Sequence, residues 1–468
     1  MVILNRPGRL IPLIVACALF MENLDATIIA TALPQIAQAL HEEPLHLSLA
    51  ITSYLLSLAV FIPLSGWIAD RYGARRVFRT AIVLFTLGSV CCGLSQSMPQ
   101  LVAARVLQGL GGAMMTPVGR LVLLRNVPKS ELVSAMSWLT IPALVGPVLG
   151  PPLGGLIVSY ASWRWIFFIN LPIGLLGFYL VSRFIPETAA RPGQQPLDGR
   201  GWALLGIGCA LLVAGFENLG KGLIADPLLA ALIVCGAASL LAYVRHTRTR
   251  AQPIIDLTLL RLPSFRAAVG SGSLYRISIG AYTLLMPLTL QLGFGYSPLV
   301  SGATTFVSAL GAIVMKAAAP RIVKRYGFRP LMIRNALLSA AFLVGCGLLP
   351  ALDSRLIVMA WLLAYGFFRS LEFTCINTLG FAEVDEARMS QATSFTSTLQ
   401  QLSLSMGVAL ASQLLALSRT LHGGGALLAV DFAYAFVGAA LLCVLAALGF
   451  TALPANAGAN VSGHRAAP

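Results

Sequence analysis

The chain has 468 residues, of which 57% are hydrophobic and only 10% are charged, and its formal net charge is +15 at pH 7. A soluble globular domain carries about 25% charged residues, so this composition excludes an ordinary soluble protein. At roughly 20 residues for each membrane-crossing helix, fourteen such helices need about 280 residues, close to the apolar content of the whole chain. The loops between them must therefore be short, and we expect no separate soluble domain.

Fourteen apolar stretches predict fourteen transmembrane helices. The first six are Leu10–Ala32, His46–Ala69, Val77–Ser95, Pro99–Leu123, Ser134–Val158 and Trp165–Phe184. Two shorter stretches flanked by Gly and Pro follow, at Trp202–Leu219 and Pro227–Val244. The last six are Ala267–Leu292, Ser297–Ala319, Leu331–Leu349, Leu356–Leu379, Gln391–Ala416 and Phe432–Ala452.

The positive charge is concentrated in alternate connections, which argues against nucleic acid as a partner. Cytoplasmic loops of membrane proteins carry an excess of Lys and Arg. The connections on the opposite side hold only Arg164, Lys221, Arg355 and Arg419. We therefore predict a multi-pass protein of the bacterial inner membrane, surrounded by lipid, with both termini in the cytoplasm.

A short basic segment repeats along the chain. Arg71-Tyr72-Gly73-Ala74-Arg75 follows the second predicted helix, and the similar segment 325–329 follows the tenth, 254 residues later. Parallel internal repeats are a known construction of transporters. The sequence thus predicts an all-α integral membrane fold with a six-helix bundle at residues 1–190, an inserted helix pair with its linkers at 191–262, and a second six-helix bundle at 263–468.

Six ionisable residues lie deep within the predicted helices. A charge in the bilayer centre costs about 2.5–3.5 kcal/mol on insertion scales, so it usually persists only where it faces a cavity or a partner. Three are acids and three are arginines, so their formal charges sum to zero: Glu22, Asp25, Arg105, Arg276, Arg369 and Glu372. We interpret them as the working parts of a transporter.

Asp25 and Arg105 are predicted to lie at matching depths. Asp25 is about 10 Å below the outer end of an outward-running helix, and Arg105 is about 9 Å below the outer end of an inward-running one. If the two helices are neighbours, an ion pair can form. Glu22 lies one turn from Asp25 on nearly the same helix face.

Burial favours the neutral form of a carboxyl group, whereas a nearby arginine favours the anion. A group held between these effects can bind a proton in one conformation and release it in another. We expect Asp25 to be the proton carrier, Arg105 to modulate it, and Glu22 to be a further proton or substrate site. The alternative is a static ion pair that only fixes helix packing.

The second half contains a candidate second charge site formed by Arg276, Arg369 and Glu372. Arg369 and Glu372 are three residues apart on one helix, and Arg276 falls at a depth similar to that of Arg369. One interpretation is a structural cluster whose charges satisfy each other. The other is a second proton or substrate site centred on Glu372.

The fifth predicted helix is unusually rich in Gly and Pro. Pro removes an amide donor and clashes with the preceding turn, yet in membranes such residues permit kinks and close helix contact. We expect this helix to be bent and tightly packed against a partner, at the boundary between the two bundles, rather than merely flexible. The residues concerned are Gly146, Pro147, Gly150, Pro151, Gly154 and Gly155.

The loop after the second helix combines one acid with several cations at a membrane surface. Positive-inside bias explains its arginines but not Asp70, which can cap a helix N-terminus or pair with an arginine. We predict a conformational latch made of Gly66, Asp70, Arg71, Gly73 and Arg75.

These segments resemble the major facilitator superfamily, specifically its fourteen-span drug:proton antiporters, over nearly the whole chain. Ala30 and Ala74 depart from the family pattern, and Lys324 stands where the first loop has Asp70. The matching segments are residues 24–34, 66–78, 101–112, 146–155 and 163–174. The resemblance implies two bundles, alternating access and exchange of protons for hydrophobic, often cationic compounds. It also implies that Asp25 is the proton-coupling acid and Arg105 its partner.

Other functions remain open. One is proton-coupled transport of a specific metabolite such as a sugar or organic acid, although the Gly/Pro-rich helix argues against import. Another is a sensor or scaffold that transports nothing, which would need a signalling domain. An enzyme is least expected, because the five histidines fall near or beyond helix ends and no nucleophile–base set is evident. We expect no metal or cofactor, and no feature indicates an accessory periplasmic partner.

Overall fold

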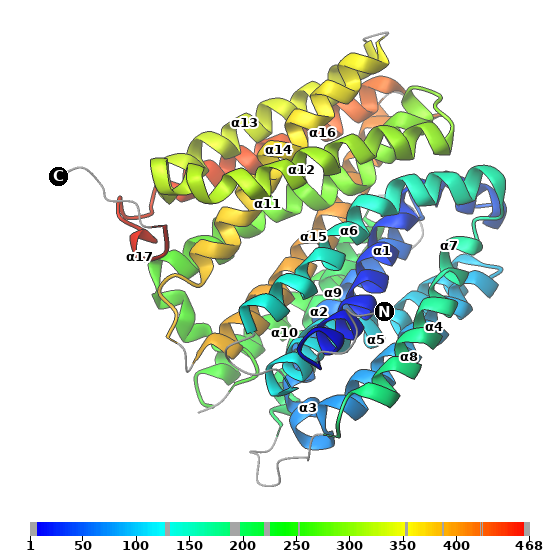
Figure 1. Ribbon diagram of the computed structural model, residues 1–468. Helices are drawn as coiled ribbons and strands as arrows, with labels where there is room; N and C mark the ends of the chain where they lie inside the picture. The colour runs from blue at the N-terminus through cyan, green and yellow to red at the C-terminus, as the bar shows by residue number, and fades with distance from the viewer. Residues whose placement is uncertain are drawn as a thin grey trace. The chain divides into compact units, whose positions relative to one another are not determined.

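The computed structural model describes residues 7–126, 132–187, 197–219, 225–250, 253–351, 354–385, 388–421, 423 and 425–462. Within these residues every regular element is helical, and the chain divides into two compact units, residues 1–206 and 207–468 (Figure 1). The all-helical prediction is confirmed for this part of the chain. The predicted three-part division stays a prediction, and its boundary at residue 190 lies outside the described residues.

Twelve helices among the described residues are long and apolar enough to cross a membrane. The count of fourteen is therefore not confirmed. The two predicted spans outside this set correspond to α6 (Leu132–Tyr160), of which Val145–Tyr160 qualifies as a shorter apolar helix, and to α11 (Pro263–Leu288).

The first unit contains eight α-helices and the short 3-10 helix η2, and part of α9. Its first helix continues eight residues beyond the predicted end at Ala32, with Pro34 inside it, so that predicted boundary was wrong. The elements are α1 (Pro7–Leu40), α2 (Ser48–Phe61), η2 (Ile62–Leu64), α3 (Ser65–Tyr72), α4 (Ala74–Leu94), α5 (Met98–Asn126), α6 (Leu132–Tyr160), α7 (Trp165–Phe168) and α8 (Asn170–Phe184). Helix α9 (Gly199–Asn218) contains the boundary between the units.

The second unit contains the rest of α9 and all later elements. They are α10 (Asp226–Thr247), η4 (Leu257–Arg261), α11 (Pro263–Leu288), η5 (Thr289–Gly293), α12 (Pro298–Tyr326), α13 (Phe328–Leu348), η6 (Leu349–Ala351), α14 (Arg355–Gly380), α15 (Met389–Leu421), α16 (Ala429–Phe450) and α17 (Ala459–Ser462).

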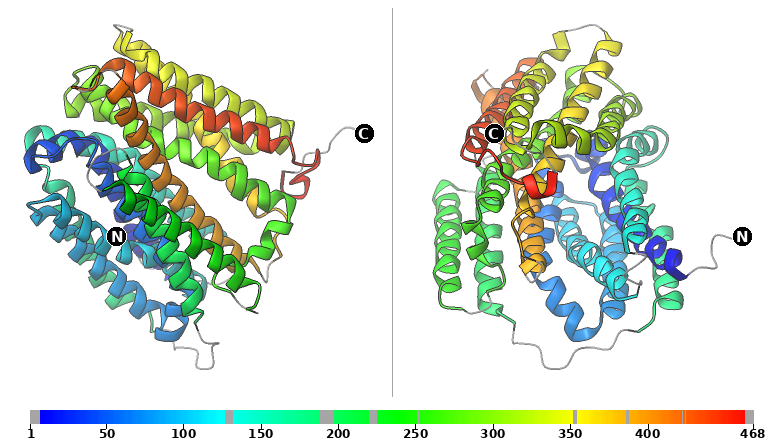
Figure 2. Two further views of the ribbon diagram at one scale, coloured as in Figure 1. Left: turned by 180° about the vertical axis from the view of Figure 1, so that it is seen from behind. Right: turned by 60° about the vertical axis from the view of Figure 1, so that its left-hand side comes forward.

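The same order of helix pairing occurs in both units. In the first, α1 packs on α6, α2 on α5, α4 on α5 and α8, and α1 on α8. In the second, α11 packs on α15, α12 on α14, α13 on α14 and α16, and α11 on α16 (Figures 1 and 2). Transporters built from parallel internal repeats show this kind of correspondence.

The repeated basic segment has the same backbone conformation in each unit. Gly73 separates α3 from α4 with φ 87°, and Gly327 separates α12 from α13 with φ 73°. Both glycines occupy the N-cap position of the next helix. A positive φ is strained for residues with a Cβ atom, which explains why each repeat carries Gly at this bend.

Helices α9 and α10 lie against each other, as two neighbouring green helices in Figure 2. Gly208 of α9 faces Leu240 of α10, and Gly236 of α10 faces Leu212 of α9. Small residues let membrane helices approach closely.

A polar contact joins the segment before α11 to the start of α15. Arg388 Nη2 donates to Asp256 Oδ2 at 2.8 Å and to Thr258 Oγ1 at 2.6 Å. Partial burial acts to raise the pKa of Asp256, but the hydrogen bonds from Thr258 and the Arg388 guanidinium outweigh it and hold the pKa below its ordinary value.

Candidate functional site

The first unit contains a fully buried ion pair between α1 and α5. Arg105 Nη1 lies 2.6 Å from Asp25 Oδ2, and neither side chain has any exposed area. The two residues predicted at matching depth therefore meet. A charge-assisted hydrogen bond of this length is among the stronger polar contacts in proteins.

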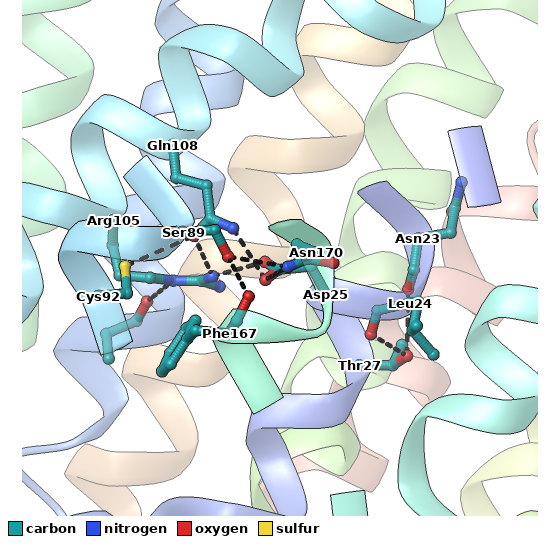
Figure 3. Close-up of polar contacts among 11 residues, drawn as sticks. Asn23, Leu24, Asp25, Thr27, Ser89, Cys92, Arg105, Gln108, Phe167 and Asn170 are labelled. Carbon is teal, nitrogen blue, oxygen red and sulfur yellow. Dashed lines mark hydrogen bonds and ion pairs between the residues drawn. The ribbon is translucent and has the colours of Figure 1, made fainter. Parts of the chain in front are cut away.

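Two neutral donors complete the surroundings of Asp25 (Figure 3). Gln108 Nε2, one turn after Arg105 on α5, donates to Asp25 Oδ1 at 2.8 Å. Asn170 Nδ2, at the start of α8, donates to the same oxygen at 2.9 Å and to Ser89 Oγ at 2.9 Å. An ionised carboxylate only accepts hydrogen bonds, so three donors, and no acceptor among the described residues, suit the charged form of Asp25.

The Arg105 guanidinium is held by groups from several helices. Its Nε donates to the carbonyl oxygen of Ala50 at 3.0 Å, and its Nη1 also donates to Gln108 Oε1 at 2.7 Å. The Tyr54 ring centroid lies 4.3 Å from the guanidinium carbon and that of Phe167 lies 5.8 Å away. Cation–π contacts of a desolvated arginine contribute about 2 kcal/mol. This cation is thus fixed by both charge and shape.

Glu22 lies apart from the ion pair. Thr116 Oγ1 of α5 donates to its Oε2 at 2.8 Å, and Glu22 is 9% exposed. Residues three apart on a helix share a face, so Glu22 and Asp25 both point toward α5 but contact different residues there. The predicted coupling role of Glu22 stays a prediction.

The Gly-rich face of α6 packs directly on α1. A Cβ atom at Gly146 would lie 3.0 Å from the Leu24 backbone nitrogen, and one at Gly154 would lie 2.6 Å from the Ile28 carbonyl oxygen. At Gly150 it would clash with the Thr27 hydroxyl. The four-residue spacing puts these glycines on one helix face. The tight contact expected of this helix is present, and its partner is the helix that carries Asp25.

Comparison with known proteins identifies the class of molecule. Residues 15–408 match the family model of the Major Facilitator Superfamily. The chain belongs to the major facilitator superfamily. It is 38% identical over 461 residues to the "Putative multidrug resistance protein MdtD" of Salmonella typhimurium, covering 96% of this chain and 95% of that protein. The protein of the same name from Escherichia coli strain K12 / DH10B is 38% identical over 464 residues, with the same coverage.

Solved structures share the fold of this major facilitator at low sequence identity. A D-xylose-proton symporter superposes with a TM-score of 0.69 at 16% identity, covering 96% of this chain and 98% of its own. An auto-inhibited POT family peptide transporter gives 0.69 at 15% identity, covering 94% and 96%. The family model and the 38% identity make the chain a multi-pass membrane transporter that groups with proteins named as putative multidrug resistance proteins.

The first basic loop of this major facilitator contains the predicted latch. Arg75 Nη2 donates to the carbonyl oxygen of Ser182, close to the end of α8, and Arg75 Nη1 lies 3.9 Å from Glu187. Gly73, not Asp70, is the N-cap residue of α4, and Asp70 lies in the last turns of α3. The loop is thus tied to α8 through Arg75, while the latch role itself stays a prediction.

The remaining latch residues lie at the surface or in the bend. Arg71 stacks on Trp67, with its guanidinium carbon 5.4 Å from the ring centroid. Beyond its chain neighbours and the backbone of its own helix, no atom of the described residues would lie within 4 Å of a Cβ at Gly66.

The three charges of the second half do not form the self-satisfying cluster that was one interpretation. Arg276 Nη2 donates to Asn377 Oδ1 at 2.8 Å and its Nη1 to the Ala268 carbonyl oxygen at 3.2 Å. The Arg369 guanidinium lies over the ring of Tyr282, 5.1 Å from its centroid. Glu372 accepts from Asn335. Among the described residues these three make no ion pair, and each side chain contacts a different helix: Arg276 contacts α14, Arg369 contacts α11 and Glu372 contacts α13.

Sequence reasoning assigned no site role to Gln108, Asn170 or Ser89, which hold Asp25 in place. Gln108 and Asn170 are uncharged polar residues inside predicted helices. That is the signal that could have found them, because an unpaired amide in the bilayer is also costly.

Proposed function

We propose that this transporter exports hydrophobic or cationic small molecules in exchange for protons, with Asp25 as the proton carrier and Arg105 as its electrostatic partner. The observation that carries the proposal is the fully buried Asp25–Arg105 ion pair. It is supported further by the 38% identity to proteins named as putative multidrug resistance proteins.

The ion pair supplies a physical reason for coupling. A proton on Asp25 cancels its charge and leaves Arg105 with only neutral partners among the residues that the structure describes. Removing one charge of a buried pair costs about 3–5 kcal/mol. A free energy of this size, when it favours a second conformation, changes the equilibrium constant between the two conformations by about two to four orders of magnitude. Protonation from outside and release inside would therefore drive alternating access of the two bundles.

We also propose fourteen spans, with α6 and α11 added to the twelve. Helix α11 has 26 residues and α6 has 29. At 1.5 Å per residue, 26 residues extend about 39 Å, more than the roughly 30 Å of a bilayer core. Two six-helix bundles and an inserted pair, α9 and α10, would then lie in the bacterial inner membrane with both termini in the cytoplasm.

Glu22 is proposed to act with Asp25 in the same site. Its carboxylate accepts a hydrogen bond from Thr116, interacts electrostatically with Arg120 and retains some exposure. An acid with few partners at the edge of a buried site is suited to attract a cationic compound. The Gly-rich face of α6 supports this arrangement, since it holds α1 from the opposite side.

The test uses purified protein in proteoliposomes, with ethidium as the transported probe and a pH-sensitive dye as the readout of proton movement. We expect ethidium to drive proton flux in the wild type and not in Asp25→Asn. The matched control is Asp431→Asn, which alters another buried aspartate that caps α16 and does not contact Arg105. Ethidium-driven proton flux in Asp25→Asn equal to that of the control would refute the role of Asp25.

A further inference from the structure

The interior of the second unit contains a carboxyl group whose surroundings are opposite to those of Asp25. Glu372 of α14 is completely buried. Its Oε2 accepts one hydrogen bond, from Asn335 Nδ2 of α13 at 2.8 Å. Its Oε1 has no hydrogen-bond partner among the described residues. Where Asp25 has a cation and two further donors, Glu372 has a single neutral amide.

The titratable groups that interact with Glu372 are uncharged in their ordinary forms. They are Tyr275 of α11, Cys375 on α14 itself and Cys443 of α16. Tyr275 is bonded to Ser339 of α13 at 2.8 Å, and Cys443 Sγ lies 3.0 Å from Ser278 Oγ. These contacts engage Tyr275 and Cys443 without supplying a positive charge.

The cations on the helices that pack around α14 are directed elsewhere. Arg276 of α11 is bonded to Asn377 and to the Ala268 carbonyl, and Arg369 of α14 stacks on tyrosine rings. The other arginines and lysines on these helices lie at exposed positions or, for Arg329, bond to the Thr451 carbonyl. Those at exposed positions are Arg266, Lys316, Arg321, Lys324, Arg325, Arg334 and Arg355. Within the described residues, then, no ion pair compensates Glu372.

An ionised carboxylate in such a place is strongly unfavourable. Moving an isolated charge into a low-dielectric interior costs several kcal/mol even after relaxation, and the usual escape is to bind a proton. A neutral carboxylic acid needs far less compensation, since its carbonyl oxygen can accept the Asn335 amide hydrogen. The geometry therefore favours a protonated Glu372 in this conformation.

We propose that Glu372 is a second proton-binding site of the transport cycle, occupied by a proton in the conformation in which Asp25 is ionised and paired with Arg105. The inference rests on the proposed proton-coupled function and assigns that function a second carrier. One acid in each unit would then hold opposite protonation states at the same time. A protein with two carriers moves at least one more proton per cycle than a protein with Asp25 alone.

The first test measures protonation directly and does not depend on transport. Infrared spectra of the full-length protein in lipid at neutral pH are compared for the wild type, Glu372→Gln and Asp25→Asn. We expect the carbonyl stretching band of a protonated carboxylic acid to be lost in Glu372→Gln and retained in Asp25→Asn. In Asn335→Ala, which keeps Glu372, the band should move to higher frequency because the donor is gone. An unchanged band in Glu372→Gln would overturn the proposal.

The second test measures the ratio of protons to ethidium moved in proteoliposomes. We expect Glu372→Gln to lower this ratio by one proton, whereas Asp25→Asn abolishes the coupling. An unchanged ratio of protons to ethidium in Glu372→Gln would show that the Glu372 proton does not move during the cycle. That result would refute Glu372 as a second carrier and would leave the role of Asp25 intact. Absence of coupled flux in the wild type would instead refute the proposed function, and the infrared band would still decide the protonation of Glu372.

Discussion

The contact between α1 and α6 provides a prediction whose size follows from the structure. In Gly154→Ala the new Cβ would clash with the Thr31 hydroxyl and would lie 2.6 Å from the Ile28 carbonyl oxygen, and this oxygen belongs to the backbone and cannot rotate away. A carbon–oxygen contact settles at about 3.3 Å, so the two helices must separate by about 0.7 Å. Overpacking of this kind costs about 1–3 kcal/mol.

The matched control is Gly177→Ala in α8. Its Cβ would meet Ile82 Cδ1 at 3.7 Å, an ordinary contact. Both substitutions gain the same helix propensity, up to about 1 kcal/mol, so their difference isolates the packing cost. We expect Gly154→Ala to melt at a lower temperature than Gly177→Ala in detergent, and to export ethidium less well in cells.

A third variant separates backbone from side-chain clashes. At Gly150 the nearest obstacle is the Thr27 hydroxyl. Gly150→Ala should therefore be destabilising alone and partly rescued by Thr27→Ala, whereas the same change at Thr27 should not rescue Gly154→Ala. Equal melting temperatures for Gly154→Ala and Gly177→Ala would refute the close packing inferred for this face.

Three further predictions concern charged contacts. Arg105→Lys keeps the charge but loses at least one charge-assisted hydrogen bond, which contributes about 1.5–3 kcal/mol. Ethidium export in an efflux-deficient host should therefore fall about tenfold or more. Export at the wild-type rate would show that a positive charge at this position is enough for transport. Arg75→Ala frees the end of α8 from α4 and should lower the melting temperature, whereas Arg76→Ala, at an exposed position, should not. Equal melting temperatures for the two variants would refute a stabilising role for the Ser182 contact. Because the pKa of Asp256 is lowered in the folded protein, its stabilisation is complete above the ordinary value of about 3.9 and is lost as pH falls through the lowered value. The melting difference between the wild type and Asp256→Asn should thus be constant near neutral pH and vanish only in strong acid, and a difference that vanishes nearer neutrality would contradict the lowered pKa.

The buried charges of the first unit could be identified from the sequence because charge is rare and costly in a membrane helix. Counting residues from the helix ends placed Asp25 and Arg105 at one depth, and the structure brings them into contact. The rotation of each helix about its axis could not be predicted in this way. For that reason Gln108 and Asn170 were assigned no site role, although each donates to Asp25.

In the second unit, residue spacing in the sequence did not predict which side chains are in contact. Arg369 and Glu372 are three residues apart, which places their backbones on one face but does not decide where long side chains extend. Arg369 lies over tyrosine rings and Glu372 reaches α13. Proximity in the sequence therefore did not predict the contacts of Arg369 and Glu372, because surrounding helices supply their partners.

Gly73 and Gly327 impose one bend twice, 254 residues apart, on halves whose polar interiors differ. Such a molecule inherits its shape by duplication but can diversify its chemistry one half at a time. Populations grown under a toxic compound should accordingly keep both bends while accumulating unlike changes in the two interiors.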